Sequence, residues 1–286
     1  MTDWPVNKFL YITMTMFPSA CMWTYRIPIN DALREIKETA YHYVDVETDL
    51  LDTPAAIECL KSLGLKIGCV ALDHKLPPGS SMDGKDAGAT RNAIAFIKKV
   101  LEKSQALGVQ ATYVAPCKDR KDLKAFASAM TELAEDAAGR GIRFCVEHVP
   151  GRALPSAKEA LAFVEGVSHP NMYLLLDVGH TLLSKEKAWE IAAAAGKRIG
   201  YVQLSDNDGR SDRHWPLLEG RLTLEALTKI LEALKQVGYE GTLGMELKHD
   251  RASLCSVFSR NHNLILRLQA TAEIKSLKEP ETRRKQ

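Results

Sequence analysis

The stretch Met172-Tyr173-Leu174-Leu175-Leu176-Asp177 decides how we interpret the fold. It is almost continuously apolar and ends on a carboxylate, which is typical of a parallel strand covered on both faces. Seven further short apolar runs are spaced along the chain, and helical patterns lie between them. The eight runs are Phe9–Phe17, Tyr41–Glu47, Leu65–Leu72, Val109–Pro116, Ile142–Val149, Met172–Val178, Ile199–Leu204 and Thr242–Leu247.

The spacing of these runs predicts a single (β/α)8 TIM barrel. A glycine stands where four of the intervening helices should end before the next strand, at Gly64, Gly108, Gly141 and Gly238. Eight such repeats within about 270 residues fit a barrel better than a doubly wound sheet, which more often uses five to seven strands. We expect residues 1–272 to form the catalytic barrel and residues 273–286 to form a charged tail that is mobile or serves as a partner arm.

The charge of the chain argues against a partner that is a polyanion. The 286 residues include 38 Lys and Arg against 36 Asp and Glu, and without residues 273–286 the two counts are equal.

The six cysteines form no CxxC pair, so we expect reduced thiols rather than a disulfide framework. No stretch reaches the roughly 18 apolar residues of a membrane span, and the first residues lack the pattern of a secretion signal. We therefore expect a cytoplasmic protein with no nucleic-acid or membrane partner.

Oxygen donors stand at the predicted ends of four consecutive strands. Because the active site of such a barrel is built at the carboxyl ends of its strands, these side chains should converge. A divalent cation between them would offset the cost of burying three carboxylates. Any single one of them could instead be a solvent-facing loop residue or a helix cap, but four in register favour a metal site. The four residues are Glu147, Asp177, Gln203 and Glu246.

Four segments around these donors resemble the signature blocks of the xylose isomerase-like barrel superfamily. This group contains sugar isomerases and epimerases, inosose and dehydroshikimate dehydratases, and apurinic endonucleases. The matching region runs from about Gly141 to Glu246, with looser agreement over the first half of the chain. The four segments are Cys145-Val146-Glu147-His148, Leu174-Leu175-Leu176-Asp177-Val178-Gly179-His180, Tyr201-Val202-Gln203-Leu204-Ser205-Asp206 and Gly238-Tyr239-Glu240-Gly241-Thr242-Leu243-Gly244-Met245-Glu246.

The resemblance implies that Glu147, Asp177, Gln203 and Glu246 are the metal ligands. The third ligand of the family is commonly His, whereas this chain has Gln203, as the hydroxypyruvate isomerase-like branch does. An amide oxygen in place of an imidazole nitrogen should tilt the site away from zinc. We therefore expect Mn²⁺ or Mg²⁺ as the cofactor, ahead of Co²⁺ or Zn²⁺.

His180 and the segment Asp212-Arg213-His214 resemble the DxxH and DxH elements that bind an additional zinc in the endonuclease relatives. Those relatives also use histidines at the ends of strands three and four. This chain has His74 near the end of strand three and no histidine at the end of strand four. The trinuclear zinc site therefore cannot be completed from the matching positions. For His180, Asp212 and His214 the sequence leaves two roles open, substrate binding or proton relay on one side and structural hydrogen bonding on the other.

Four further residues at the predicted catalytic face are candidates for substrate binding. Glu47 ends the second strand and Lys248 follows Glu246 by two positions, although each could be a rim charge in solvent. Trp23 and Trp215 fall in the loops after strands one and seven. They could form an apolar lid over the site or simply pack the loops together.

The predicted reaction is proton transfer next to a carbonyl. The cation would hold the carbonyl and hydroxyl oxygens of a small carbohydrate and stabilise the enediolate that forms when a proton leaves. Glu147 and Glu246 would be the catalytic acid and base on opposite sides of the substrate. Return of the proton to the neighbouring carbon gives an isomerase, and return to the other face of the same carbon gives an epimerase.

The sequence leaves three other functions open below this one. The closest alternative is a lyase or dehydratase of the inosose, dehydroshikimate or C-glycoside type, because the same enediolate can expel a leaving group. A non-catalytic barrel and an apurinic endonuclease rank lower. The sequence also leaves the oligomeric state open, and a homo-oligomer is compatible with the resemblance.

Overall fold

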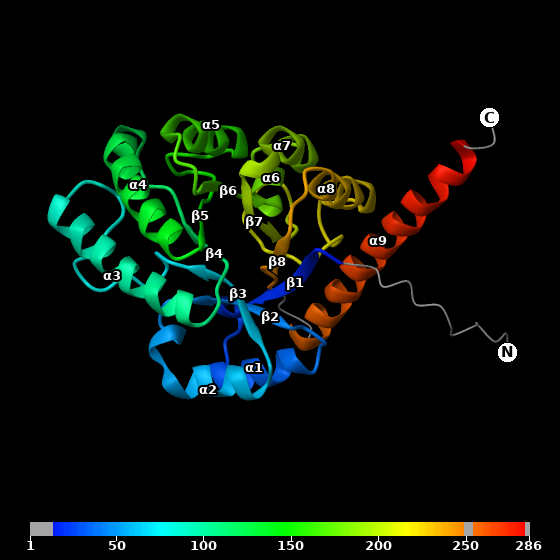
Figure 1. Ribbon diagram of the computed structural model, residues 1–286, viewed down its shortest axis with the longest axis horizontal. Coiled ribbons are helices and arrows are strands. Elements are labelled where there is room, and N and C mark those ends of the chain that lie inside the picture. Colours follow the sequence, from blue (N-terminus) through cyan, green and yellow to red (C-terminus); the bar gives the residue numbers. More distant parts are fainter. Residues whose placement is uncertain (1–13, 249–253, 284–286) are drawn as a thin grey trace.

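The computed structural model describes residues 14–248 and 254–283. Within them, parallel strands pair in chain order, and β1 also pairs with β8, which closes the sheet into a (β/α)8 barrel (Figure 1). The predicted fold class is thus confirmed. The strands are β1 (Met16–Cys21), β2 (Tyr43–Glu47), β3 (Lys66–Ala71), β4 (Ala111–Val114), β5 (Arg143–Val146), β6 (Met172–Asp177), β7 (Ile199–Leu204) and β8 (Gly241–Met245).

Helices surround the barrel and bury its outer face in one continuous apolar core. The four glycines predicted to end helices do so after α2, α3, α4 and α8, each with a left-handed φ between 64° and 72°. No helix among the described residues is long and apolar enough to cross a membrane. The helices are α1 (Ile29–Lys37), α2 (Pro54–Ser62), α3 (Ala87–Ala106), α4 (Leu123–Gly139), α5 (Ala157–Val167), α6 (Val178–Leu183), α7 (Ala188–Ala195), α8 (Leu224–Gln236) and α9 (Leu254–Arg283).

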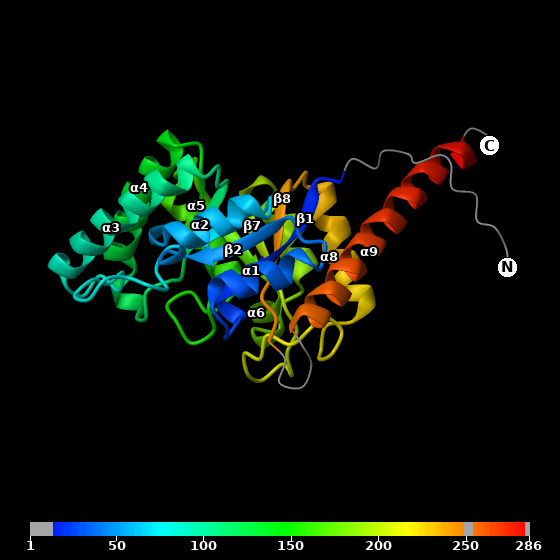
Figure 2. The same ribbon diagram turned by 90° about the horizontal axis from the view of Figure 1, so that it is seen from below.

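The first strand and the last helix differ in their bounds from the sequence-based expectation. The first strand is predicted at Phe9–Phe17, of which residues 9–13 lie outside the described residues, whereas β1 starts only at Met16. Pairing explains the shift, because Ser19, Ala20 and Cys21 align with β2, and Ser19 and Cys21 place small side chains beside Asp45 on the crowded inner face. At the other end, α9 continues through most of segment 273–286 and extends past the barrel (Figures 1 and 2). The boundary at residue 272 stays a prediction.

The inside of the barrel is filled by aromatic and small side chains around one buried carboxyl group. Asp45 of β2 accepts hydrogen bonds from the Ser19 hydroxyl (2.8 Å) and from the Tyr201 hydroxyl. Gly244 leaves the space that Tyr201 occupies, because a Cβ at this position would collide with the Tyr201 hydroxyl. Burial raises the pKa of Asp45 to about 6, although the hydrogen bonds from Tyr201 and Ser19 counteract the rise.

The buried Asp45 makes a prediction about stability and pH. A carboxyl whose pKa rises from 3.8 to about 6 on folding stabilises the fold when protonated, and this contribution is lost as the pH rises between these two values. Asp45→Asn cannot lose a proton, so its stability does not show this loss. From about pH 4 to about pH 7, the free energy of unfolding of the variant should therefore rise relative to that of the wild type by up to about 3 kcal/mol. Urea unfolding of both proteins at the two pH values, in the presence of a chelator, measures the difference. A difference that does not change with pH would contradict the assignment.

Candidate active site

The four predicted donors stand side by side at the carboxyl ends of β5 to β8. Asp177 is the last residue of β6 and pairs in register with Gln203 of β7. Glu147 and Glu246 are the first residues after β5 and β8, and the backbone N–H of each still donates to the neighbouring strand, to Val114 and Leu204 respectively. This continuation of the ladder fixes where the two glutamates stand. Three of the four donors are buried, and the Glu246 side chain is 12% exposed.

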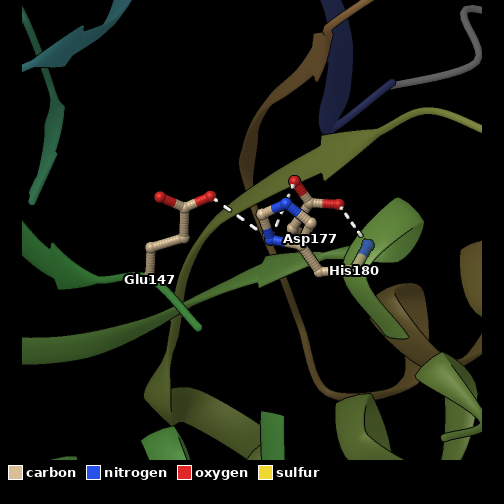
Figure 3. A group of neighbouring side chains, drawn as sticks. All are labelled: Glu147, Asp177 and His180. Atoms are coloured by element: carbon tan, nitrogen blue, oxygen red, sulfur yellow. Dashed lines mark hydrogen bonds and ion pairs between the residues drawn. The ribbon is translucent and has the colours of Figure 1, made fainter. Parts of the chain in front are cut away.

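Glu147, Asp177 and His180 form a cluster in which one ligand atom of each residue lies within 4.8 Å of the others (Figure 3). The Nδ1 atom of His180 is 3.5 Å from Glu147 Oε1 and 3.6 Å from Asp177 Oδ2. Asp177 also caps α6, because its Oδ1 accepts the backbone N–H of His180 at 2.9 Å. The cap orients the carboxylate and leaves Oδ2 free to face the cluster.

The hydrogen bonds of His180 decide its role in this cluster. Its Nδ1 lies 2.7 Å from the backbone oxygen of His148, and since a carbonyl can only accept, Nδ1 carries a hydrogen. A protonated nitrogen cannot bind a metal ion, although Nδ1 is the ring atom closest to both carboxylates. His180 is therefore a hydrogen-bond donor beside the cluster, and the oxygens of Glu147 and Asp177 are the atoms suited to a cation.

A chain of polar side chains connects the two predicted catalytic glutamates. From Glu147 it passes to His180, whose Nε2 is 3.3 Å from Asp212 Oδ2. The same Asp212 oxygen is 3.1 Å from His214 Nε2, which in turn is 3.5 Å from Glu246 Oε1. The sequence predicted these five residues at the site, and the structure brings them together.

The groups along this series of side chains shift the pKa values of one another. Burial opposes a charge on His180, but Asp177, Asp212 and Glu147 together hold its pKa well above the usual value. Burial acts on His214 in the same way, and Asp212 and Glu246 raise its pKa. The pKa of Asp212 is in turn far below its usual value, because its hydrogen bonds to the two histidines outweigh burial.

The two carboxyls at the centre are destabilised as anions. Burial raises the pKa of Glu147 to about 8, and the charges of Asp177 and Glu246 add to the rise while His180 counteracts it. Burial also raises the pKa of Asp177, with Glu246 again contributing. A further positive charge in the site would therefore favour the carboxylate form of Glu147.

Two oxygen atoms show that the site fits a divalent cation. Asp177 Oδ2 and Gln203 Oε1 are both buried and have no hydrogen-bond partner. Each buried acceptor without a partner costs about 1–3 kcal/mol. A cation that binds carboxylate and amide oxygens, as Mn²⁺ and Mg²⁺ do, would satisfy both atoms and offset the raised pKa of Glu147.

The four remaining candidates divide between two sides of the barrel mouth. Glu47 lies 3.5 Å from His74 Nδ1 and 3.7 Å from Lys75 Nζ. Burial raises the pKa of Glu47, but these two groups lower it by a larger amount, so the pKa is below its usual value. Trp23 packs edge-on against His74, with the ring centroids 5.5 Å apart.

On the opposite side, Trp215 forms an isolated antiparallel bridge with Asp206. Lys248 is exposed and donates its backbone N–H to the His214 carbonyl at 2.6 Å. This bond ties the loop after β7 to the segment after Glu246. Substrate binding by any of Glu47, Lys248, Trp23 and Trp215 stays a prediction.

Three residues at the site were not among the predicted functional residues. His148 accepts the backbone N–H of Asp177 at Nε2 (3.2 Å), and its position next to Glu147 was the available signal. Tyr113 of β4 was counted only as part of an apolar run, yet its hydroxyl faces Gln203 Nε2 at 3.5 Å and His74 Nε2 at 3.3 Å. His74 was considered only as a zinc ligand, and the polar pair Asp73-His74 after β3 could have indicated more.

Comparisons with known proteins agree with this fold. The family model described as "Xylose isomerase-like TIM barrel" matches residues 33–278. An L-ribulose 3-epimerase from Methylomonas sp. (strain DH-1) is 33% identical over 122 residues, which cover 42% of this chain and 40% of that protein. A D-psicose 3-epimerase from Ruminiclostridium cellulolyticum is 24% identical over 191 residues, 62% of each chain. The chain thus matches less than two thirds of the length of each of these relatives.

Solved structures show the same fold over nearly the whole chain. A D-psicose 3-epimerase with D-tagatose from Clostridium cellulolyticum H10 superimposes with a TM-score of 0.72 at 17% identity, covering 90% of this chain and 99% of that one. A D-tagatose 3-epimerase-like protein gives a TM-score of 0.74 at 19% identity, covering 92% and 100%. At these identities the likeness establishes the barrel and leaves the substrate open.

The orphan oxygens make a prediction about metal binding. At about 100 times the dissociation constant, Mn²⁺ should raise the free energy of unfolding of the metal-stripped protein by about 2.7 kcal/mol. Asp177→Asn keeps an acceptor for the cap of α6 but removes the anionic oxygen, so most of this gain should disappear. Thermal or urea unfolding with and without Mn²⁺ measures it. Asp31→Asn, on the exposed face of α1, is the matched control and should retain the full gain. Equal stabilisation of both variants would refute the site.

Proposed function

Because this chain belongs to the xylose isomerase-like TIM barrel family, we propose that it is a divalent-metal-dependent isomerase or epimerase of a sugar or a related hydroxy-carbonyl compound. The observation that carries the proposal is the pair of buried oxygens without partners, on Asp177 and Gln203, beside Glu147 with its raised pKa. The relatives named L-ribulose 3-epimerase and D-psicose 3-epimerase support a ketose as the substrate class.

Glu147, Asp177, Gln203 and Glu246 would hold the cation. When bound, it would polarise the substrate carbonyl and stabilise the negative charge that develops on the oxygens. Its charge would also favour the carboxylate form of Glu147, which is the form that can accept a proton.

The two glutamates would then divide the proton transfer between them. In the proposed mechanism one of Glu147 and Glu246 removes the proton from the carbon beside the carbonyl, and the other delivers a proton. Delivery to the opposite face of the same carbon gives an epimer, and delivery to the neighbouring carbon gives an isomer. His180 and His214, which lie 3.5 Å from Glu147 and Glu246 respectively, carry raised pKa values and would balance the charge on each glutamate as the proton moves. Asp212 holds both histidines in place.

A screen of ketoses in deuterated water with added Mn²⁺ tests the proposed reaction. We expect deuterium to enter at the carbon beside the carbonyl, with formation of an epimer or an isomer, as observed by NMR. Loss of a hydroxyl group from the substrate instead would identify the lyase or dehydratase alternative. Absence of both exchange and product across pentuloses, hexuloses and smaller hydroxy-ketones would count against an enzyme of this class.

The roles of Glu147 and Glu246 make a second prediction. Replacement of either by Gln keeps an oxygen donor but removes the proton acceptor, so turnover should fall by about 10²-fold or more. Steady-state kinetics on the substrate found in the screen measure the loss. Glu132→Gln, which removes the charge of an exposed partner of Lys98, should leave turnover unchanged. Turnover near that of the wild type in either active-site variant would remove that residue from the mechanism.

The amide at position 203 makes a third prediction, on metal preference. Activity should be lost in chelator and restored best by Mn²⁺ or Mg²⁺, because the proposed donors are all oxygens. Gln203→His introduces a nitrogen donor and should move the preference toward Zn²⁺ or Co²⁺ without abolishing metal binding. A metal titration of stripped wild type beside the variant makes the comparison. Reactivation of the wild type by zinc alone, or full activity after rigorous stripping, would overturn the ligand assignment.

A further inference from the structure

Gln203 differs from the other proposed ligands because its two terminal atoms are not equivalent. A carboxylate offers an oxygen in either orientation, whereas an amide offers an oxygen in one orientation and N–H groups in the other. In the structure, Nε2 of Gln203 faces the Tyr113 hydroxyl at 3.5 Å, and Oε1 is the buried atom without a partner. Only this orientation presents an oxygen to a cation.

The hydrogen bonds beyond Tyr113 favour the same orientation. His74 Nδ1 is 3.5 Å from Glu47 Oε1, and because a carboxylate accepts, Nδ1 is the ring nitrogen that carries the hydrogen. In the neutral ring Nε2 is then an acceptor, and it lies 3.3 Å from the Tyr113 hydroxyl. In that form the hydroxyl donates its hydrogen to His74. Burial lowers the pKa of His74, but Glu47 and Asp73 raise it above its usual value, and in the protonated ring Nε2 donates to the hydroxyl oxygen instead. In either form the hydroxyl oxygen keeps a lone pair that can accept from Gln203 Nε2.

We propose that Tyr113, held by His74 and Glu47, is a positioning residue that turns the Gln203 oxygen toward the metal ion. The inference rests on the proposed function, since it needs the cation site. Without the Tyr113 hydroxyl, the N–H groups of Gln203 lose their acceptor on that side. Asp177, its neighbour in register on β6, then becomes the competing acceptor, and an amide turned that way cannot ligate.

The surroundings of Tyr113 allow the hydroxyl to be tested apart from the ring. The buried ring stacks on Tyr201, with centroids 6.4 Å apart and planes at 13°, and also contacts Trp23. Tyr113→Phe keeps these ring contacts and removes only the hydroxyl. Tyr201→Phe is the matched control, because it makes the same deletion in the stacked partner, whose hydroxyl donates to Asp45 rather than to the metal site.

The experiment is a titration of metal-stripped protein with Mn²⁺ alone. Calorimetry and the EPR signal of free Mn²⁺ measure the binding. Tyr113→Phe should weaken Mn²⁺ binding by about 10-fold or more, the scale on which outer partners of metal ligands act. Tyr201→Phe should bind within about 3-fold of the wild type, because its hydroxyl orients no ligand. Mn²⁺ affinity of Tyr113→Phe equal to that of the wild type overturns the inference.

A second background separates orientation from general disruption of the site. Gln203→Glu presents an oxygen in either orientation, so adding Tyr113→Phe to it should cost about 3-fold or less. The same loss in both backgrounds would mean that Tyr113 does not act through the amide, and it overturns the inference. If Tyr113→Phe does not fold, His74→Leu replaces it. This variant removes the ring that orients the Tyr113 hydroxyl and should also weaken Mn²⁺ binding. Unchanged binding overturns the inference.

Mn²⁺ binding by the wild type distinguishes failure of the proposed function from failure of the positioning role. Failure of the wild-type protein to bind Mn²⁺ at all would refute the proposed metal-dependent function, and the positioning role with it. Binding by the wild type together with unchanged binding by Tyr113→Phe would refute only the positioning role.

Discussion

Negative charge held out of contact with water is the constraint on which the mouth of this barrel depends. Glu147 and Asp177 are buried side by side, and burial together with mutual repulsion raises the pKa of both. Such a group is stable only if it is protonated, paired or bound to a cation. His180 lies beside both carboxylates, but it also pairs with Asp212, and it leaves Asp177 Oδ2 without a hydrogen-bond partner. The site is therefore short of positive charge, which is what a divalent cation supplies.

Histidines and backbone groups control the direction in which each donor points. His148 receives the backbone N–H of Asp177, and its own carbonyl receives Nδ1–H of His180. One residue thus fixes the turn after β6 and the orientation of the neighbouring imidazole. The Asp177 carboxylate is divided in the same way, with one oxygen capping α6 and the other facing the site. Structural and chemical roles are shared within single side chains, so few of these positions can change independently.

The barrel interior supports the site from within. Tyr113 and Tyr201 stack across the interior, and their hydroxyls point to different partners, the first to His74 and Gln203 and the second to Asp45. The β2 to β4 side of the mouth thereby contacts the donor set on β7, although it contributes none of the proposed ligands. Through this connection Glu47, far from the proposed metal ligands in sequence, would influence the orientation of one of them.

The sequence by itself determined the fold class and the four strand-end donors. Buried parallel strands must be nearly continuously apolar, so a polar residue that ends such a run, as Asp177 does, marks the catalytic edge without knowledge of any contact. It also indicated His180, Asp212 and His214, through their resemblance to the DxxH and DxH elements of the family. It could not place the first strand, because Phe9–Phe17 and Met16–Cys21 are similar in apolar character and pairing with β2 and β8 makes the choice.

Only the tertiary structure decided which atom of each donor faces the site. Tyr113 belongs to an apolar run and gave no functional signal, yet it lies 90 positions from Gln203 in the chain and within 3.5 Å of its amide nitrogen. The protonation of His180 at Nδ1 likewise follows from a carbonyl 32 positions away. Hydrogen-bond direction depends on which partners meet across the barrel, and the local sequence pattern records only that a residue is polar or apolar, not whom it meets.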